Sequence, residues 1–382
     1  MRVKLQLIGA VIISGSLFFS CSREGCMDEK ALNYSDKAKN ENGSCLYDNS
    51  VILSAMLNDI GENIILPRYH KMDSLTQVLD ASIQYFTSNI SEANLIIVQQ
   101  KLKQTELAWQ KCSTFEFGPA EDNSLRTHVN TFPTDVLSIE DKIVSGSYDL
   151  NSFLATGYKG LPAIDYLVNK NDNNTTVSDF QSASNRVTFL ENLSSSLKID
   201  ISKVYLGWIA SNGNYIETFV SSEGSDVSSS LSLLINQFNY DYELLKNAKI
   251  GIPLGKATLG RPKPKQLEAY YGKISAELAN ESIKGLFNLY NGISESGIDE
   301  NGFRDYLLKL GNESLISKID DQFDQAIGSI ELLPDPMEET IQNNISLVEA
   351  AYEEIKKLVV LIKTDMSAEM EVSITYSDAD GD

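Results

Sequence analysis

Histidine and cysteine, two side chains that often carry out chemistry in proteins, are scarce in this chain. Its 382 residues include two histidines, His70 and His128, and four cysteines. Neither histidine is followed by a glutamate three or four residues later, the spacing that places two ligands on one helix face. The sequence also contains no Walker loop, HExxH, GxSxG or paired CxxC motif. This composition argues against a multi-histidine metal centre and against histidine-driven hydrolysis.

Two of the cysteines, Cys26 and Cys45, flank a short segment rich in loop-forming residues. A segment of this size cannot bury a core of its own and needs a covalent cross-link. In an oxidising compartment the two cysteines can pair, and closing that loop is worth about 3 kcal/mol in the chain-entropy model. Cys112, by contrast, lies on a helical pattern beside Trp109, and we expect it to be a buried free thiol.

The start of the chain carries the basic residues Arg2 and Lys4, followed by an apolar run from Leu5 to Phe19 and then by Ser20 and Cys21. The run is shorter than the roughly 20 apolar residues that a spanning helix needs. It resembles a bacterial lipoprotein signal, which implies cleavage after residue 20, acylation of Cys21 and a membrane partner held through lipid. The expected location is the cell envelope, as an outer-membrane lipoprotein facing the periplasm or the exterior. The alternative is an ordinary secretory signal with an incidental cysteine.

The chain is strongly acidic, with 53 acidic and 32 basic residues and a net charge of −21. Phosphate backbones repel such a surface, so we expect no nucleic-acid partner. The basic residues Lys256, Arg261, Lys263 and Lys265 form one cluster against this background. They either bind an anionic ligand or form a solvated loop, and the sequence leaves both open.

From Val51 to about Thr364, apolar residues recur at the three-to-four-residue spacing of amphipathic helices. Ser91 is placed to cap one of them, and Pro67, Pro264 and Pro336 suit first-turn positions. The pattern predicts an all-α fold of antiparallel helical bundles. Predicted long helices span about 178–208, 226–245, 264–289, 313–332 and 335–363. The alternation from Val372 to Tyr376 predicts a short strand before an acidic tail.

Two glycine- and proline-containing stretches, 114–147 and 250–264, interrupt the helices at comparable points. They predict two related halves joined near residue 212. The expected organisation is a signal peptide (1–20), a linker with the disulfide module (21–48), a first bundle (49–212), a second bundle (213–364) and an acidic tail (365–382).

The most informative stretch of the helical region runs from Thr156 to Val168. With Phe117-Gly118-Pro119-Ala120, Phe132-Pro133-Thr134-Asp135 and Trp109, it resembles the imelysin family, peptidase family M75. The resemblance covers roughly residues 51–363, extending into Gly255–Tyr271 and Gly302–Leu307. It implies the family's all-helical fold of two related bundles.

Imelysins carry a GxHxxE motif, and the same register here holds Gly160, Pro162 and Asp165. In the family motif, histidine and glutamate share a helix face and can jointly hold a metal. Pro162 has no side-chain donor, so it can neither bind a metal nor act as a base, and it suits the first turn of a helix. We therefore expect no catalytic residue and no metal ligand, and we assign the degenerate motif to a pocket.

Asp165 keeps a carboxylate at the motif's glutamate position, and two interpretations of it remain open. It either lines a pocket between the bundles or is a helix-face acid bonded to backbone or an arginine. Trp109 is more typical of a core residue than of a ligand-stacking one. The expected neighbours of such a pocket are Trp109, Glu116, Arg126 and Asp135.

The segment around Cys26 and Cys45 resembles a disulfide-bonded module of secreted Bacteroidetes proteins, GC-x-D-x-x-A-x-NY…DGSC-x-Y. Asn42 stands where that module has aspartate. Asp28, Asn33, Asn40 and Asn42 offer oxygen ligands of the kind Ca²⁺ takes. The alternative is a cross-linked spacer without metal. Any other cofactor is unknown from the sequence.

Three hypotheses for function follow. The preferred one is a non-catalytic imelysin-like lipoprotein that binds a ligand or partner protein between its bundles. Because the resemblance links the family to iron-regulated uptake and to heme or metal handling, it implies an iron- or heme-related ligand. The alternatives are a metallopeptidase of the M75 type, which needs a ligand that Pro162 cannot supply, and a structural component of an envelope complex.

Overall fold

The computed structural model describes residues 23–29, 31–45 and 48–376. The predicted signal peptide and the predicted lipidation site, Cys21, lie outside these residues. Contacts divide the chain between Val51 and Ile52 into two compact units. In the described ranges, no helix is both long enough and apolar enough to cross a membrane.

One disulfide bond cross-links the N-terminal unit. Cys26 and Cys45, 19 residues apart, form the expected disulfide. Two short strands, β1 (Glu24–Gly25) and β2 (Asn40–Glu41), pair in parallel. The Glu41 carboxylate accepts hydrogen bonds from the backbone N–H groups of Met27 (2.6 Å) and Gly43 (3.0 Å). A cross-link and a few polar contacts therefore replace a hydrophobic core here.

Two of the proposed calcium ligands make hydrogen bonds within this unit. The Asn42 side-chain oxygen accepts from the backbone N–H of Ser44 (3.1 Å), and the Asn33 amide donates to the Ser44 carbonyl (2.5 Å). These contacts shape the turn that carries Cys45. The calcium site stays a prediction.

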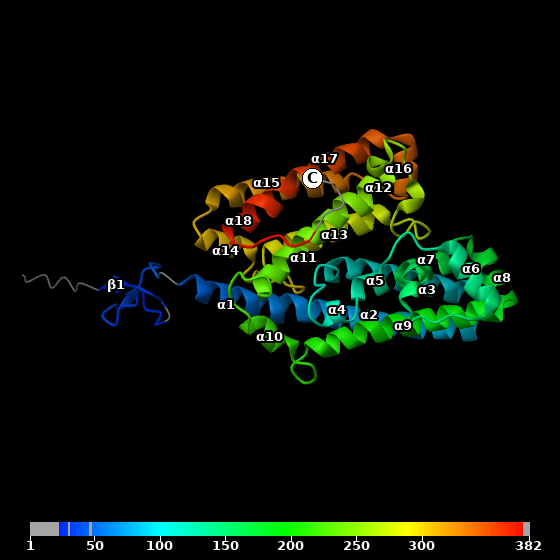
Figure 1. The fold of residues 1–382 in the computed structure, drawn as a ribbon, viewed down its shortest axis with the longest axis horizontal. Helices are drawn as coiled ribbons and strands as arrows, with labels where there is room; N and C mark the ends of the chain where they lie inside the picture. The colour runs from blue at the N-terminus through cyan, green and yellow to red at the C-terminus, as the bar shows by residue number, and fades with distance from the viewer. Residues whose placement is uncertain (1–22, 30, 46–47, 377–382) are drawn as a thin grey trace, which may run out of the picture. The chain divides into compact units, whose positions relative to one another are not determined.

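Helices make up nearly all of the regular secondary structure described in the second unit, which confirms the predicted all-α fold (Figure 1). The helices before residue 213 are α1 (Asn49–Asp59), α2 (Leu66–Ser88), α3 (Glu92–Cys112), α4 (Pro119–Asp122), α5 (Leu125–Val129), α6 (Val136–Ser145), α7 (Gly160–Asn169), α8 (Asn173–Ser182) and α9 (Ser184–Trp208), with a π-helical turn η1 (Ile60–Ile65) and a 3₁₀ segment η2 (Phe153–Tyr158). Ser91 caps α3 as predicted, accepting from the Asn94 N–H at 3.4 Å.

The chain after residue 212, the second half, is also mainly helical. Its helices are α10 (Tyr215–Ser221), α11 (Ser230–Leu244), α12 (Ile252–Leu254), α13 (Ser275–Tyr290), α14 (Phe303–Lys309), α15 (Glu313–Glu331), α16 (Met337–Asn343), α17 (Ile345–Val360) and α18 (Ser367–Glu369), with π-helical turns η3 (Leu245–Gly251) and η6 (Leu361–Met366) and 3₁₀ segments η4 (Lys256–Thr258) and η5 (Pro264–Gln266). The prediction of a helix over 313–332 is confirmed to within one residue.

Most long helices pack on helices of the same half, α3 packs on α13 across the halves, and α10 of the second half packs on η1 and α9 of the first. In the first half α2 packs on α3 and α9, while α7 packs on both α3 and α9. In the second half α15 packs on α13 and α17. One cluster of buried apolar side chains runs through both halves, from Leu53 to Val372. The boundary near residue 212 stays a prediction.

The predicted helix over 264–289 is wrong in its first part. The chain forms η5 (Pro264–Gln266), then an irregular segment, and α13 begins only at Ser275. Ala269 and Lys273 adopt positive φ angles of 46° and 57°, which an α-helix does not accommodate. This irregular segment carries residues 267–273 to α7, where the candidate site lies.

The predicted strand over Val372–Tyr376 does not form. Instead, the side chain of Asn236 on α11 forms hydrogen bonds with the backbone of residues 373–375, as a neighbouring strand would. Its amide oxygen accepts from the Thr375 N–H at 2.7 Å, and its amide nitrogen donates to the Ser373 carbonyl at 3.0 Å. A helix side chain thus satisfies backbone groups for which no partner strand lies alongside.

Candidate functional site

The degenerate motif forms the start of the buried helix α7. Gly160 adopts a φ of +77°, and a Cβ there would lie 2.4 Å from the Val129 carbonyl oxygen. Only glycine satisfies both constraints. Pro162 lies in the first turn of α7, as predicted, and residues 160–168 are all buried. The motif glycine thus lets α7 begin in direct contact with the end of α5.

Asp165 joins α7 to the second half of the chain. One carboxylate oxygen accepts from the Asn169 side chain at 2.9 Å, and the other accepts from the Tyr271 N–H at 3.2 Å. A Cβ at residue 272 would lie 2.9 Å from the Asp165 carboxylate, so Gly272 permits this close approach. Burial raises the pKa of Asp165 to about 7, although hydrogen bonds from Asn169, Tyr271 and Gly272 oppose the rise.

A cavity of about 240 Å³, the Asp165 cavity, opens beside this contact. Its walls come from the 132–136 segment, from α7 and from the 265–271 segment, so both halves of the chain contribute. Its lining is largely apolar and aromatic, with a few polar groups: Phe132, Pro133, Thr134, Val136, Pro162, Asp165, Lys265, Gln266, Leu267, Ala269, Tyr270 and Tyr271. Asp165 therefore both lines a pocket between the halves and bonds to backbone, so the two interpretations of this residue hold together.

A second cavity of about 230 Å³, the Arg126 cavity, shares Phe132 with the first. Its lining includes Trp109 on α3 and Tyr240 and Asp241 on α11, so it also draws on both halves. The Arg126 guanidinium lies over the Tyr240 ring, 4.8 Å from its centroid. Its terminal nitrogen donates to the Ser113 carbonyl at 2.7 Å, whereas its buried Nε makes no hydrogen bond to any described residue.

Buried polar side chains connect the two halves behind these cavities. Lys249, in the π-helical turn η3, donates to the Glu268 carboxylate and to the Gln110 side chain, the latter at 2.6 Å. Asn130 donates to the same Glu268 carboxylate at 2.7 Å. Lys249 and Glu268 are at least 90 % buried, and π-helical turns often occur at functional sites.

Glu106 on α3 is a further buried acid in this region. Burial raises its pKa well above the ordinary value, and the nearby Asp165 and Glu268 carboxylates add to the rise. Sequence reasoning missed Glu106, Lys249 and Glu268. The available indication was that Glu106 lies on the α3 face that carries Leu102 and Trp109, where an apolar residue is expected.

None of the four expected pocket neighbours lines the Asp165 cavity itself. Trp109 and Arg126 line the Arg126 cavity, with Trp109 almost fully buried as a core residue. Glu116 accepts from the Arg126 backbone N–H at 2.9 Å, and burial raises its pKa to about 7 against the opposing effect of the Arg126 charge. Asp135 instead caps α6 by accepting from the Ser138 N–H at 3.1 Å, and it lines neither cavity.

Neither histidine makes a hydrogen bond or an ion pair with the motif carboxylate in the described part of the chain. His128 Nδ1 lies 3.6 Å from the Asp200 carboxylate, and the His70 ring packs on Tyr205. Among the described residues, the single group of three acid, cysteine or histidine side chains with ligand atoms within 4.8 Å is Cys26, Glu41 and Cys45. Two of those three form the disulfide, so that group offers no metal site.

Two residues of the basic cluster, Lys256 and Lys265, have different surroundings. Lys256 lies 3.9 Å from Glu349 and 5.0 Å from the centroid of the Tyr352 ring. Lys265 lines the Asp165 cavity. One of the four basic residues is thus placed to meet a ligand there. Cys112 is buried and free, as predicted, and burial raises its pKa to about 12.

The imelysin family model matches residues 65–362, which is most of the chain. This chain belongs to the imelysin family. The match confirms the resemblance found around Gly160–Asp165 and spans both helical halves of this imelysin. A search of curated proteins found no match.

Two solved structures share the fold of this imelysin. A protein from Parabacteroides distasonis, provisionally named an iron-regulated protein A precursor, aligns with a TM-score of 0.70 at 16% identity, over 84% of this chain and 95% of its own. An imelysin-like protein from Psychrobacter arcticum aligns with a TM-score of 0.68 at 14% identity, over 86% of this chain and 98% of its own. At these identities the similarity establishes the fold.

Proposed function

We propose that this imelysin is an envelope-anchored, non-catalytic lipoprotein that binds a small ligand between its two helical halves. The observation that supports this proposal most directly is that Pro162 and Asp165, at the degenerate motif, line one cavity together with the 265–271 segment of the second half. Mostly apolar pockets with a few placed polar groups are typical ligand sites. The adjoining Arg126 cavity extends the site past Phe132.

The proposal of a non-catalytic role rests on the chemistry of Pro162. The pyrrolidine ring at the histidine position, whose one nitrogen belongs to the backbone amide, supplies neither a metal ligand nor a base. The remaining motif acid, Asp165, already accepts hydrogen bonds on both oxygens and has its pKa raised to about 7. Metal binding requires the deprotonated carboxylate, so this environment disfavours it.

An iron-containing ligand is the first candidate to test, because a structural neighbour carries an iron-regulated name. The experiment titrates the full chain, with Cys21→Ser to prevent acylation, with hemin and with ferric citrate. Ala248→Phe fills the Arg126 cavity that Ala248 lines. Ala368→Phe is the matched control, because Ala368 is exposed in α18. Saturable binding that Ala248→Phe weakens and Ala368→Phe preserves supports the proposal.

Absence of binding by either probe would argue against an iron-related ligand and favour the role of a structural component in an envelope complex. The metallopeptidase alternative is tested separately, by metal analysis of the purified protein and by casein hydrolysis with and without a chelator. One equivalent of divalent metal together with chelator-sensitive hydrolysis would contradict the non-catalytic role.

The proposed anchor requires its own test, because Cys21 lies outside the described residues. Palmitate labelling in the native host should mark the wild-type chain and not the Cys21→Ser chain. Membrane fractionation should place the labelled protein in the outer membrane. Label on both chains, or on neither, contradicts lipidation at Cys21.

A further inference from the structure

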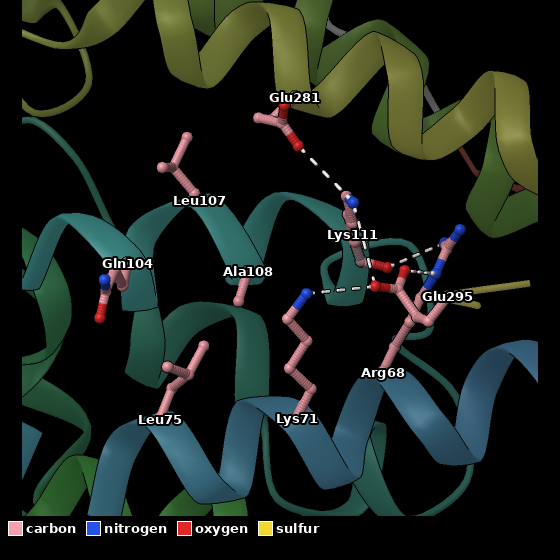
Figure 2. A pocket seen from close by; sticks show the side chains of 9 residues that line it. All are labelled: Arg68, Lys71, Leu75, Gln104, Leu107, Ala108, Lys111, Glu281 and Glu295. Carbon is pink, nitrogen blue, oxygen red and sulfur yellow. Dashed lines mark hydrogen bonds and ion pairs between the residues drawn. The ribbon is translucent and has the colours of Figure 1, made fainter. Parts of the chain in front are cut away.

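A third cavity, of about 380 Å³, lies away from the motif, between α2, α3 and α13 (Figure 2). We name it the Lys111 cavity. Its volume falls in the roughly 300–1,000 Å³ range typical of small-molecule sites. It is lined by Arg68, Lys71, Leu75, Gln104, Leu107, Ala108, Lys111, Glu281 and Glu295.

Three cations share one carboxylate at one end of this cavity. Glu295 lies 3.2 Å from the Arg68 guanidinium, 3.4 Å from the Lys71 ammonium and 3.9 Å from the Lys111 ammonium (Figure 2). Burial alone raises the pKa of Glu295, but Arg68, Lys111 and Lys71 together hold it below the ordinary value. Including Glu281, three positive and two negative groups line the cavity, in a chain whose net charge is −21.

The two lysines are available to a ligand in a way that Arg68 is not. Arg68 is fully buried and donates to Glu295 and to the backbone carbonyls of Lys111 and Gly285. The Lys111 ammonium lies 3.7 Å from Glu281 and 3.9 Å from Glu295, beyond hydrogen-bond distance in both cases. A charge-assisted bond forms at about 2.7–2.9 Å, so Lys111 has unused bonding capacity toward an added anion.

The other end of the cavity is mostly aliphatic, with the Gln104 side-chain amide as its polar group. Leu75 from α2 and Leu107 and Ala108 from α3 line it, and Figure 2 shows Leu75 and Leu107 on the side away from Glu295. Cationic groups at one end and aliphatic side chains at the other match a molecule with a charged head and an apolar chain.

We propose that the Lys111 cavity binds an amphipathic monocarboxylate, with its carboxylate between Lys71 and Lys111 and its aliphatic chain along Leu75, Leu107 and Ala108. This site is separate from the Asp165 and Arg126 cavities and does not depend on the function proposed for them. A single carboxylate restores charge balance among the lining groups. A dianion such as phosphate would instead oppose Glu281 and Glu295 and gain nothing from the apolar wall.

The test is calorimetric titration of the full chain, carrying Cys21→Ser, with hexanoate, octanoate and decanoate below their micelle concentrations. Burying one methylene is worth about fourfold in affinity when complete, so we expect a gain of about two- to fourfold per carbon in this partly open cavity. Octylammonium should not bind, and 1-octanol should bind at least about tenfold more weakly than octanoate, because it lacks the charge that pairs with lysine.

Two lysine variants identify the site. Lys111→Met keeps an aliphatic stem but removes the charge, and it should weaken octanoate binding about tenfold or more. Lys103→Met is the matched control on the same helix, because Lys103 pairs with Glu277 at 2.6 Å and does not line the cavity. If Lys111→Met does not fold, Lys71→Met gives the same comparison, since the Lys71 side chain is 55% exposed.

Three results would each overturn the proposal. The first is no saturable binding of any of the three carboxylates. The second is binding of octylammonium as tightly as octanoate. The third is equal octanoate affinity in the Lys103→Met chain and in the lysine variant of the cavity.

Discussion

The side chain of Asp165 on α7 accepts a hydrogen bond from the backbone N–H of Tyr271, 106 residues further along the chain, at 3.2 Å. Asn169 and Gly272 also donate to this carboxylate, and several such donors ordinarily hold an acid's pKa low. Here burial outweighs them, and the pKa of Asp165 rises to about 7. The contact between α7 and the 267–273 segment therefore contains an acid that titrates near neutral pH.

This relationship predicts how stability depends on pH. In the unfolded chain Asp165 loses its proton near pH 3.8, whereas in the folded chain it keeps the proton up to about pH 7. Between these values the folded state binds more protons, so the free energy of unfolding falls as pH rises, and above pH 7 the Asp165 contribution is constant. Its contribution between pH 5 and pH 8 is on the order of 2 kcal/mol. Glu116, whose pKa is also raised to about 7, acts in the same direction.

Urea unfolding at pH 5 and pH 8 measures this dependence. Asp165→Asn mimics the protonated acid, so it should reduce the difference in unfolding free energy between the two pH values. Asp141→Asn is the control, because the Asp141 side chain is 69% exposed. A pH dependence in Asp165→Asn equal to that of Asp141→Asn would show that Asp165 does not titrate in this range.

Gly160 provides a second prediction, because it combines a positive φ angle with a close contact. Gly160→Ala should destabilise the fold by about 1–2 kcal/mol through its backbone conformation and by about 1–3 kcal/mol more through the clash with the Val129 carbonyl. Gly260→Ala is a matched control, since Gly260 has the same φ of +77° but no neighbouring atom within 4 Å of the position that a Cβ would take. Urea unfolding of both variants separates the two costs. Equal destabilisation by both would mean that the α5 end moves to accommodate the methyl group.

Much of the helical architecture could be predicted because the spacing of apolar residues and the capping residues near helix ends are visible in the sequence. Glu313–Glu331 and the Ser91 cap are examples in which nearby residues determine the structure. The helix predicted to begin at Pro264 was wrong at its start because positive φ angles at Ala269 and Lys273 depend on contacts that local spacing does not reveal. One such contact is the hydrogen bond that the Ser275 hydroxyl donates to the Glu268 carbonyl, at 2.6 Å.

The candidate site could be located in the sequence only where the family motif marks it. Gly160, Pro162 and Asp165 were found because their register matches the motif. Lys249 and Glu268 were missed because, in a sequence, a lone lysine or glutamate resembles a solvated surface residue. Only the fold brings these two side chains together and removes them from water.

The N-terminal unit provides a third prediction, which concerns its disulfide. Replacing Cys26 and Cys45 with alanine should cost this unit about 3 kcal/mol, because the 19-residue loop is no longer closed. Since the helices from Ile52 onward form a separate compact unit, their thermal transition should not change. Hydrogen exchange should accelerate at the backbone amides of Ser35 and Gly43. A matching fall in the helical melting temperature would show that the two units unfold together.

The buried ion pair between Lys249 and Glu268 gives the last prediction. Lys249→Met leaves the Glu268 carboxylate buried without its cation, and breaking such a pair costs about 3–5 kcal/mol. The double variant Lys249→Met with Glu268→Gln should recover much of that loss, because no unpaired charge remains. The surface pair of Lys284 and Glu331, 2.6 Å apart and 37% and 49% exposed, is the control, and Lys284→Met should cost at most about 1 kcal/mol. Urea unfolding of the wild type and these three variants gives the comparison. A double variant no more stable than Lys249→Met alone would show that the hydrogen bonds from Gln110 and Asn130 to the Glu268 carboxylate matter more than its unpaired charge.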